Sequence, residues 1–542
     1  MTKTMAANGT GGEKIDVSCL ELHQLMEKLF KNPEERGEYL NRLPRVEVLD
    51  PAPLTSVYHQ LDKESSEKFE SGEGYRCKCS FQFAEQSSFT QMKYDDDDTA
   101  NVQYGYSTNL AYAVRENGKI TPLSQGIFPP ANIQIRRAMF GVLKCINEVD
   151  ETVNKTNKLQ YKYRCLRENL TSITFISSWG DGVVEESLGV TDQAKLIHES
   201  DCLVTLHYCP PGLPSDDDIE MRRVWKREAT LVCQEAKITS LTGRSRAIKI
   251  TVLRAEKDEI SSNPLDEDLY GEGIIHDDLW ITLKHTSTEN AAQASVSIES
   301  VSLVPKLNPD KTDGKETTDV RVIYHKPSTA FQHPNARVML SSLHWILNVL
   351  SRIIPNDSHQ GQPRNATKPR LLEMYCGCGA HTIPLAKSSL LSEIVAVELD
   401  DRLVRACRLN CRVNNCFKTS SGNSEGTHVE VLKGDAAEWA VKTLRAQYKR
   451  KISSDEATKN ENYNHFDILL VDPPRGGLDR AVCDMAIKGT FSNMIYVSCG
   501  RRALLRDLDL LCMGGFDVVD LAVIDLFPGT DAVESLVHLT RR

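Results

Sequence analysis

The chain has 542 residues, of which 40% are hydrophobic and 26% are charged, as is ordinary for a soluble globular protein. At roughly 150 residues per domain, this length predicts about three domains or two large ones. No stretch approaches the ~18 consecutive apolar residues that a membrane span requires. The formal net charge of −10 argues against wholesale coating of nucleic acid, although local basic clusters can still bind RNA.

The first residues predict no targeting segment. MTKTMAANGTGGEKIDVS lacks the apolar core of a secretory signal and the arginines of a transit peptide. The 16 cysteines are spread along the chain without the spacing of a small disulfide scaffold, so we interpret them as reduced thiols. These features predict a cytoplasmic or nuclear protein.

Two regions are predicted before residue 331. Residues 1–72 form an N-terminal helical, variable segment, with helical spacing at 20–30 and a linker that begins at residue 63. Residues 73–330 form an α+β domain with one helical run, at 133–146, and with polar inserts at 257–272 and 308–318. Its strand-like runs occupy residues 75–83, 110–123, 172–178, 202–208 and 247–253.

The third region, 331–542, alternates strands and helices. A linker at 356–370 precedes the alternation, and a polar insert at 449–465 interrupts it. Segments that contain a predicted strand are 371–380, 392–400, 428–436, 466–475, 494–500 and 516–527. This alternation predicts an α/β Rossmann-like domain, with a mostly parallel sheet that is covered by helices on both faces. Ligands bind such sheets at the carboxyl ends of the strands.

The first two candidate site motifs follow the first two of these strands. Tyr375 begins the turn YCGCG, where glycines let the backbone approach a ligand and the next helix presents its positive end. Glu398 ends the strand IVAVE some 20 residues later, where an acid commonly binds the two hydroxyls of a ribose. A turn without a ligand and a solvated helix cap are the competing interpretations. The pair at this spacing favours a nucleoside cofactor, either NAD or S-adenosylmethionine.

Two acids follow later strands. Asp435, in KGDAAEW, is placed to accept an adenine amino group, but it serves equally well as the N-cap of the next helix. Asp472 begins DPPR after the apolar run FDILLV, and the two prolines hold the backbone extended there. Methyltransferases that act on exocyclic amines use a similar acid–Pro–Pro sequence before an aromatic residue. Arg475 occupies that place, which argues against amine chemistry.

Cys499 and Glu534 complete the candidates. Cys499 ends the core strand YVSC at the edge where the cofactor should lie, so its thiolate is a candidate nucleophile, and a buried structural cysteine is the alternative. Glu534 lies in FPGTDAVE near the C-terminus and would mean little by itself.

The motif series resembles that of RNA (uracil-5-)-methyltransferases. EMYCGCG, AVELD, VDPPRGGL, YVSCG and DLFPGTDAVE occur in the order seen in that family, and the tRNA branch, which makes 5-methyluridine in the T-loop, is the most similar. YRCKCSFQF, LTGRSRAIKI and FQHPNARVMLSSLHWIL extend the resemblance upstream. It covers roughly residues 75–542.

The resemblance implies a role for each matching residue. Cys499 matches the nucleophile and Glu534 the proton-abstracting base, while Tyr375, Glu398 and Asp472 match positions that contact S-adenosylmethionine. His333 stands where the family has a cofactor-contacting glutamine. Uracil C5 does not attack a sulfonium methyl unaided, so the thiolate must first add to C6, and a carboxylate must later remove the C5 proton.

The sequence also departs from the family at three places. His333 replaces the glutamine, Gly500 replaces the asparagine that usually follows the cysteine, and Asp531–Ala532 replace a histidine near the base. Three alternatives stay open: the same chemistry on ribosomal RNA, a cytosine-5 RNA methyltransferase, and an RNA-binding or RNA-folding protein with weak catalysis. The cytosine class uses a cysteine directly after a proline, which this chain lacks.

RNA is the expected partner, tRNA above all, and a monomer is expected. Candidate phosphate contacts in the α+β domain are Arg136, Arg137, Lys162, Arg164, Arg244, Arg246 and Lys249. No metal or iron–sulfur cluster is predicted, because Cys19, Cys77 and Cys79 lack the clustered spacing of the iron–sulfur branch.

Overall fold

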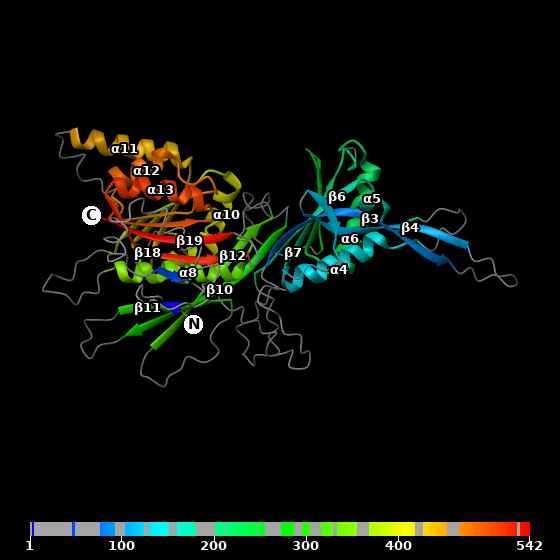
Figure 1. The fold of residues 1–542 in the computed structure, drawn as a ribbon, viewed down its shortest axis with the longest axis horizontal. Coiled ribbons are helices and arrows are strands. Elements are labelled where there is room, and N and C mark those ends of the chain that lie inside the picture. The colour runs from blue at the N-terminus through cyan, green and yellow to red at the C-terminus, as the bar shows by residue number, and fades with distance from the viewer. Residues whose placement is uncertain are drawn as a thin grey trace, which may run out of the picture. The chain divides into compact units, whose positions relative to one another are not determined.

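A computed structural model of the chain describes most of the predicted elements (Figure 1). The described residues are 3–4, 46–48, 76–92, 103–116, 118–123, 128, 130–150, 160–179, 201–210, 212–246, 248–254, 273–286, 295–303, 316–328, 333–354, 368–417, 426–452, 465–527 and 532–542. The helix predicted at 20–30, the linker from residue 63, the insert at 257–272, nearly all of the linker at 356–370 and Asp531 lie outside these ranges.

The described residues group into two compact units. Unit 1 comprises Met1–Thr55, Asp278–His325 and Asn335–Arg542, and unit 2 comprises Ser56–Asp277 and Lys326–Pro334. This grouping places residues 278–325 with the C-terminal part of the chain, whereas the sequence assigned them to the α+β domain. The predicted boundaries at 72/73 and 330/331 stay predictions.

Unit 1 contains a nine-stranded sheet in the order β1-β2-β18-β19-β17-β16-β13-β14-β15. Its parallel strands are β13 (Arg370–Met374), β14 (Glu393–Glu398), β15 (His428–Lys433), β16 (Ile468–Val471) and β17 (Asn493–Ser498). The chain then doubles back in β18 (Phe516–Asp525) and β19 (Val533–Arg541), and β19 pairs antiparallel with β17. The short strands β1 (Lys3–Thr4) and β2 (Val46–Val48) extend the edge beyond β18. The predicted α/β Rossmann-like fold is confirmed.

Helices cover both faces of this sheet. On one side lie α11 (Ala436–Ile452), α12 (Arg480–Lys488) and α13 (Arg501–Met513), and α8 (Ala336–Ile353) lies on the other (Figure 1). Two further helices are α9 (Thr382–Lys387) and α10 (Asp401–Val413). The core under α11, α12 and α13 is apolar; its fully buried members include Leu469, Tyr496, Val482 and Leu504. Burial on both faces explains why β16 reads ILLV without a polar residue.

A three-stranded sheet was not predicted from the sequence. It has the order β11-β10-β12, with β10 at Ile274–Thr286, β11 at Ser295–Ser302 and β12 at Glu316–Pro327. α8 packs against β11. Polar residues are frequent in all three strands, so the alternation that identified other strands was weak here.

Unit 2 contains a seven-stranded sheet in the order β5-β4-β3-β6-β7-β8-β9. Its strands are β3 (Lys78–Met92), β4 (Gln103–Glu116), β5 (Lys119–Pro122), β6 (Leu170–Ser177), β7 (Cys202–Tyr208), β8 (Ser240–Ser245) and β9 (Ile248–Leu253). Every pair is antiparallel except β7–β8, which α6 (Ile219–Glu235) connects. The helical run predicted at 133–146 is confirmed as α4 (Ile133–Asn147), and a short α5 spans Arg164–Arg167.

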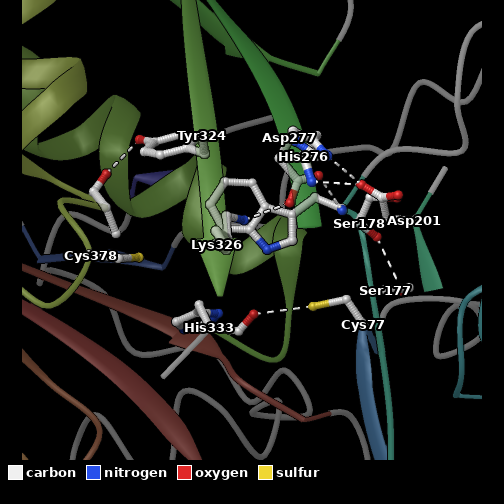
Figure 2. A network of polar contacts seen from close by, with 12 residues as sticks. Cys77, Ser177, Ser178, Asp201, His276, Asp277, Tyr324, Lys326, His333 and Cys378 are labelled. Carbon is white, nitrogen blue, oxygen red and sulfur yellow. Dashed lines mark hydrogen bonds and ion pairs between the residues drawn. The ribbon is translucent and has the colours of Figure 1, made fainter. Parts of the chain in front are cut away.

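Unit 2 contains a buried polar network around Lys326 (Figure 2). The Lys326 ammonium lies 2.6 Å from Asp277, and each side chain is only 2% exposed. The same ammonium lies 2.9 Å from the centre of the Trp179 ring, and the Trp179 backbone N–H donates to the other Asp277 oxygen. Burial raises the pKa of Asp277, while Lys326 opposes that shift. Charges this deeply buried persist only when paired, so the network fixes Lys326 and Asp277 together.

Candidate active site

The predicted site residues of unit 1 meet at one edge of the nine-stranded sheet. Tyr375, Glu398 and Cys499 directly follow or end parallel strands, as does Asp472, and Asp435 lies two residues after β15. Glu534 lies at the start of antiparallel β19, which brings it to the same edge. The strand order places β15, β14 and β13 on one side and β16, β17 and β19 on the other. The order along the sheet reverses between β13 and β16, and ligands of α/β sheets bind at such a switch point.

The glycine-rich turn after β13 packs against Glu398. Tyr375, Gly377 and Gly379 all have positive φ, at 64°, 58° and 90°, so the chain turns sharply between β13 and α9. The Gly377 N–H donates to Glu398 Oε2 over 3.0 Å, and the Asp400 N–H donates to Oε1 over 2.9 Å. A carboxylate has about four acceptor positions, so the two oxygens retain capacity for a ligand diol.

The space beside this turn suits an adenosine group. A Cβ added at Gly377 would meet no atom within 4 Å, so the backbone is open on that side. Leu399, next to Glu398, leaves 60% of its surface exposed. The apolar side chain of Leu399 offers a surface on which an adenine ring can pack. The neighbouring Glu398 carboxylate offers hydrogen-bond acceptors for the ribose hydroxyls. Sequence reasoning missed Leu399, whose only signal was an apolar residue directly after the acid.

Tyr375 and Asp435 lie near each other at this edge of the sheet. The Tyr375 side chain packs against the unit 1 core, and burial with the nearby Asp479 and Asp435 carboxylates raises the pKa of its phenol. Asp435 accepts a hydrogen bond of 2.9 Å from the Glu438 N–H, so it caps α11, the alternative that the sequence left open. Contact of either residue with a cofactor stays a prediction.

Cys499 and Glu534 occupy matched positions on adjacent strands. Ser498 pairs with Ser535 in the antiparallel ladder, so the next residue of the β17 path, Cys499, faces Glu534. Glu534 is only 4% exposed, whereas Cys499 is half-buried. The sulfur and the carboxylate of such a pair can both reach one small heterocyclic ring that is bound between them.

Acidic neighbours oppose ionisation at this end of the sheet. Burial, Glu534 and Asp472 raise the pKa of the Cys499 thiol, in that order of size. Burial and the Glu534 carboxylate likewise raise the pKa of Asp472 well above its usual range, although 36% of that side chain is accessible. The three groups therefore interact, and a thiolate at Cys499 needs a cation.

Arg475 is a cation close to this thiol, and sequence reasoning missed that proximity. Its guanidinium lowers the pKa of Cys499 through its charge and a hydrogen bond, against the larger effects of burial and the acids. Gly500 makes this approach possible, because a Cβ there would overlap the backbone carbonyl of Arg475. Cys499 also precedes the N-terminus of α13, whose dipole favours a negative charge. The only sequence signal was the arginine of DPPR, which had served only as an argument against amine chemistry.

Two further polar residues, Glu373 and His381, lie in β13 and directly before α9, beside the residues of the site. Glu373, in β13, is 1% exposed and accepts a 2.7 Å hydrogen bond from the Thr382 hydroxyl; burial raises the pKa of Glu373 well above its usual range. His381 Nδ1 lies 3.9 Å from Asp472 Oδ2. Glu373 thus anchors Thr382 at the start of α9, while His381 lies beside Asp472, and neither carries a motif that would identify it from sequence.

The remaining predicted residues lie in unit 2. His333 belongs to the segment Lys326–Pro334, and its carbonyl oxygen accepts a hydrogen bond of 3.2 Å from the Cys77 thiol (Figure 2). A cofactor contact by His333 stays a prediction.

The basic candidates of unit 2 differ in how they are engaged. Arg137, Arg244 and Arg246 are exposed and Arg136 is half-buried. Lys162 lies 3.0 Å from Glu148 and 3.3 Å from Glu235, and Arg164 lies 2.5 Å from Glu168. These carboxylates compete with phosphate for Lys162 and Arg164, which weakens the prediction for that pair.

Two kinds of feature are absent from the described residues. None of their helices is long and apolar enough to cross a membrane. In the same residues, no group of three or more His, Cys, Asp or Glu side chains is arranged to hold a metal ion.

Comparison with known proteins gives related sequences. A tRNA/tmRNA (uracil-C(5))-methyltransferase of Sulfurimonas denitrificans is 33% identical over 215 residues, 39% of this chain and 49% of the relative. One from Pseudoalteromonas translucida is 29% identical over 41% of this chain and 51% of the relative. The chain thus spans about half the length of these two relatives. One from Pseudoalteromonas atlantica is 26% identical over 83% of this chain and 86% of the relative.

A solved structure and a family model complete the comparison. Pyrococcus abyssi tRNA (uracil-54, C5)-methyltransferase in complex with S-adenosyl-L-homocysteine superposes with a TM-score of 0.40 at 15% identity, covering 88% of this chain and 77% of that chain. Residues 306–542 match the family model for tRNA (Uracil-5-)-methyltransferase. This match covers 237 of the 542 residues, all in the C-terminal part of the chain, which is similar to that family there.

Proposed function

We propose that this protein is an S-adenosylmethionine-dependent enzyme that methylates uracil C5 in tRNA, at a uridine of the T-loop. The observation that carries the proposal is the meeting of Cys499, Glu534 and Arg475 at the end of β17. The family match and the relatives' names support the substrate class. Glu398 and the open turn at Gly377 fit the ribose and adenine ends of the cofactor, and Asp472 lies between that turn and Cys499 in strand order.

The chain's own residues supply the nucleophile and the base. Arg475 favours the Cys499 thiolate, which adds to C6 of the uracil and makes C5 nucleophilic. S-adenosylmethionine, when bound, supplies the electrophilic methyl group that C5 takes. Glu534 then accepts the C5 proton, the bond between Cys499 and C6 breaks, and the thiolate is released. The target uridine must leave its base stack to reach a site at a sheet edge.

A covalent trap tests this proposal. Wild-type protein with T-loop RNA that contains 5-fluorouridine and S-adenosylmethionine should give a stable protein–RNA band on a denaturing gel. The band persists because fluorine cannot leave C5 as a proton does. Cys499→Ala should abolish the band and turnover while RNA still binds. Cys512→Ala, at a half-buried cysteine on α13, is the matched control and should behave as wild type.

Glu534→Gln separates the two chemical roles. This variant should add to normal uridine and methylate it, then stall without a base, so it should trap a covalent complex on unmodified RNA. A band that survives Cys499→Ala would show that the nucleophile is misassigned. No band with the wild type, together with no methyl transfer to tRNA or ribosomal RNA, would refute the enzyme and favour the RNA-binding alternative.

A further inference from the structure

α4 carries an exposed aromatic residue on the face opposite its core contacts. The helix buries one side in the unit 2 core, through Ile135, Ala138, Met139, Val142, Cys145 and Ile146. Phe140 lies on the other side and leaves 75% of its surface exposed. This side chain contributes nothing to the core, and its accessible ring can stack on another planar group.

Basic residues flank Phe140 on the same helix face. Arg137 precedes it by three residues and Lys144 follows it by four, so the three side chains share one face of α4, and both cations are exposed. At 1.5 Å per residue the cations begin about 4.5 Å before and about 6 Å after Phe140 along the helix. α4 contains three basic residues and no acidic one, in a chain whose net charge is −10.

We infer that this face of α4 binds an unpaired nucleotide of the RNA, with its base stacked on Phe140 and its flanking phosphates paired with Arg137 and Lys144. An aromatic ring between two cations matches the alternation of base and phosphate in single-stranded RNA. A protein partner could also pack on the apolar ring, but it would need a carboxylate opposite each of the two cations. The inference rests on the proposed function for its choice of RNA, and it adds a binding element outside the catalytic unit.

Affinity measurements on the full chain test the stacking interaction. The probes are a labelled single-stranded oligouridine and a fully paired RNA duplex, read by fluorescence anisotropy. Phe140→Leu should weaken oligouridine binding by about 5- to 150-fold, the range expected when one base–aromatic stack is removed, and Phe140→Tyr should stay within about twofold of wild type. The duplex offers no unpaired base, so its affinity should be the same for all three proteins.

Salt dependence separates the ring from the cations. Arg137→Gln and Lys144→Gln should each lower the slope of log affinity against log salt for oligouridine by about 0.7, whereas Phe140→Leu should leave the slope unchanged. Met513→Ala, at a side chain that is 86% exposed on α13, is the control and should change neither quantity. Melting temperatures should match for all variants, because none of these side chains contributes to the core.

Several results would overturn the inference: wild-type oligouridine affinity for Phe140→Leu, equal losses on duplex and single strand, or failure of Phe140→Tyr to retain binding. Wild-type RNA affinity combined with changed self-association in the ultracentrifuge would assign the face to protein contact. Methyl transfer is scored separately, at saturating tRNA. A wild type that methylates while Phe140→Leu binds normally defeats only the inference. Loss of RNA binding in Phe140→Leu, with no methylation by the wild type, defeats only the proposed function.

Discussion

Glu398→Ala should weaken S-adenosylmethionine binding more than RNA binding. The carboxylate already accepts two backbone N–H groups, from Gly377 and Asp400, at 3.0 and 2.9 Å, which fixes its orientation at the end of β14. The remaining acceptor positions are those available to a ribose diol. Removing a hydrogen bond to a charged group costs roughly 1.5–3 kcal/mol, which corresponds to about 12- to 160-fold in Kd.

Two companion variants locate the source of that effect. Glu398→Gln keeps one carbonyl acceptor and loses the charge, so its Kd should fall between those of wild type and Glu398→Ala. Asp400→Ala removes the N-cap of α10, which accepts from the Arg402 N–H over 2.8 Å, and should lower stability by about 1 kcal/mol without changing cofactor affinity.

Isothermal titration calorimetry measures the Kd for S-adenosylmethionine of the wild type and the three variants. Fluorescence anisotropy with labelled tRNA measures their RNA binding. Unchanged cofactor affinity in Glu398→Ala would refute the ribose assignment and leave Glu398 as a clamp for the glycine turn. An equal effect in Asp400→Ala would trace the change to the fold of the turn rather than to a ligand contact.

Arg475→Gln should raise the pKa of the Cys499 thiol further, because the guanidinium opposes the effects of burial and two acids. The fraction of thiolate at neutral pH should then fall, and the rising limb of the pH–rate profile should move to higher pH. An unmoved limb in single-turnover methyl transfer would contradict that role. Lys326→Met should destabilise unit 2 by about 3–5 kcal/mol, since it strands a buried carboxylate, and adding Asp277→Asn should restore much of that stability in urea denaturation. Replacing Arg244 and Arg246 with glutamate should weaken RNA binding and lower the salt slope by about one unit for each phosphate that is no longer neutralised; an equal slope would place the basic face elsewhere.

Local patterns alone determined much of unit 1. Residues 371–527 alternate apolar runs with turn residues and helical spacing, so the parallel strands and their helices followed from the sequence. The carboxyl ends of parallel strands meet at one edge, and Tyr375, Glu398, Asp472 and Cys499 could therefore be grouped without coordinates. Glu534 joined that group only through the resemblance, because nothing in its local sequence indicates that β19 runs antiparallel beside β17.

The tertiary structure decided what depends on contacts between distant segments. Arg475 reaches Cys499 because Gly500 leaves room for its backbone, and no local spacing encodes that approach. The pairing of Lys326 with Asp277, 49 residues apart, likewise became apparent only in the fold. A charged residue is predicted to be exposed unless the partner that allows its burial is known. The strands β10, β11 and β12 have polar sequences with weak alternation, and the contact of β11 with α8 could be seen only in the fold. Sequence periodicity indicates which face of a helix or strand is buried. Which strands pair in a sheet depends on the burial of all these elements together, which the local sequence of one element does not contain.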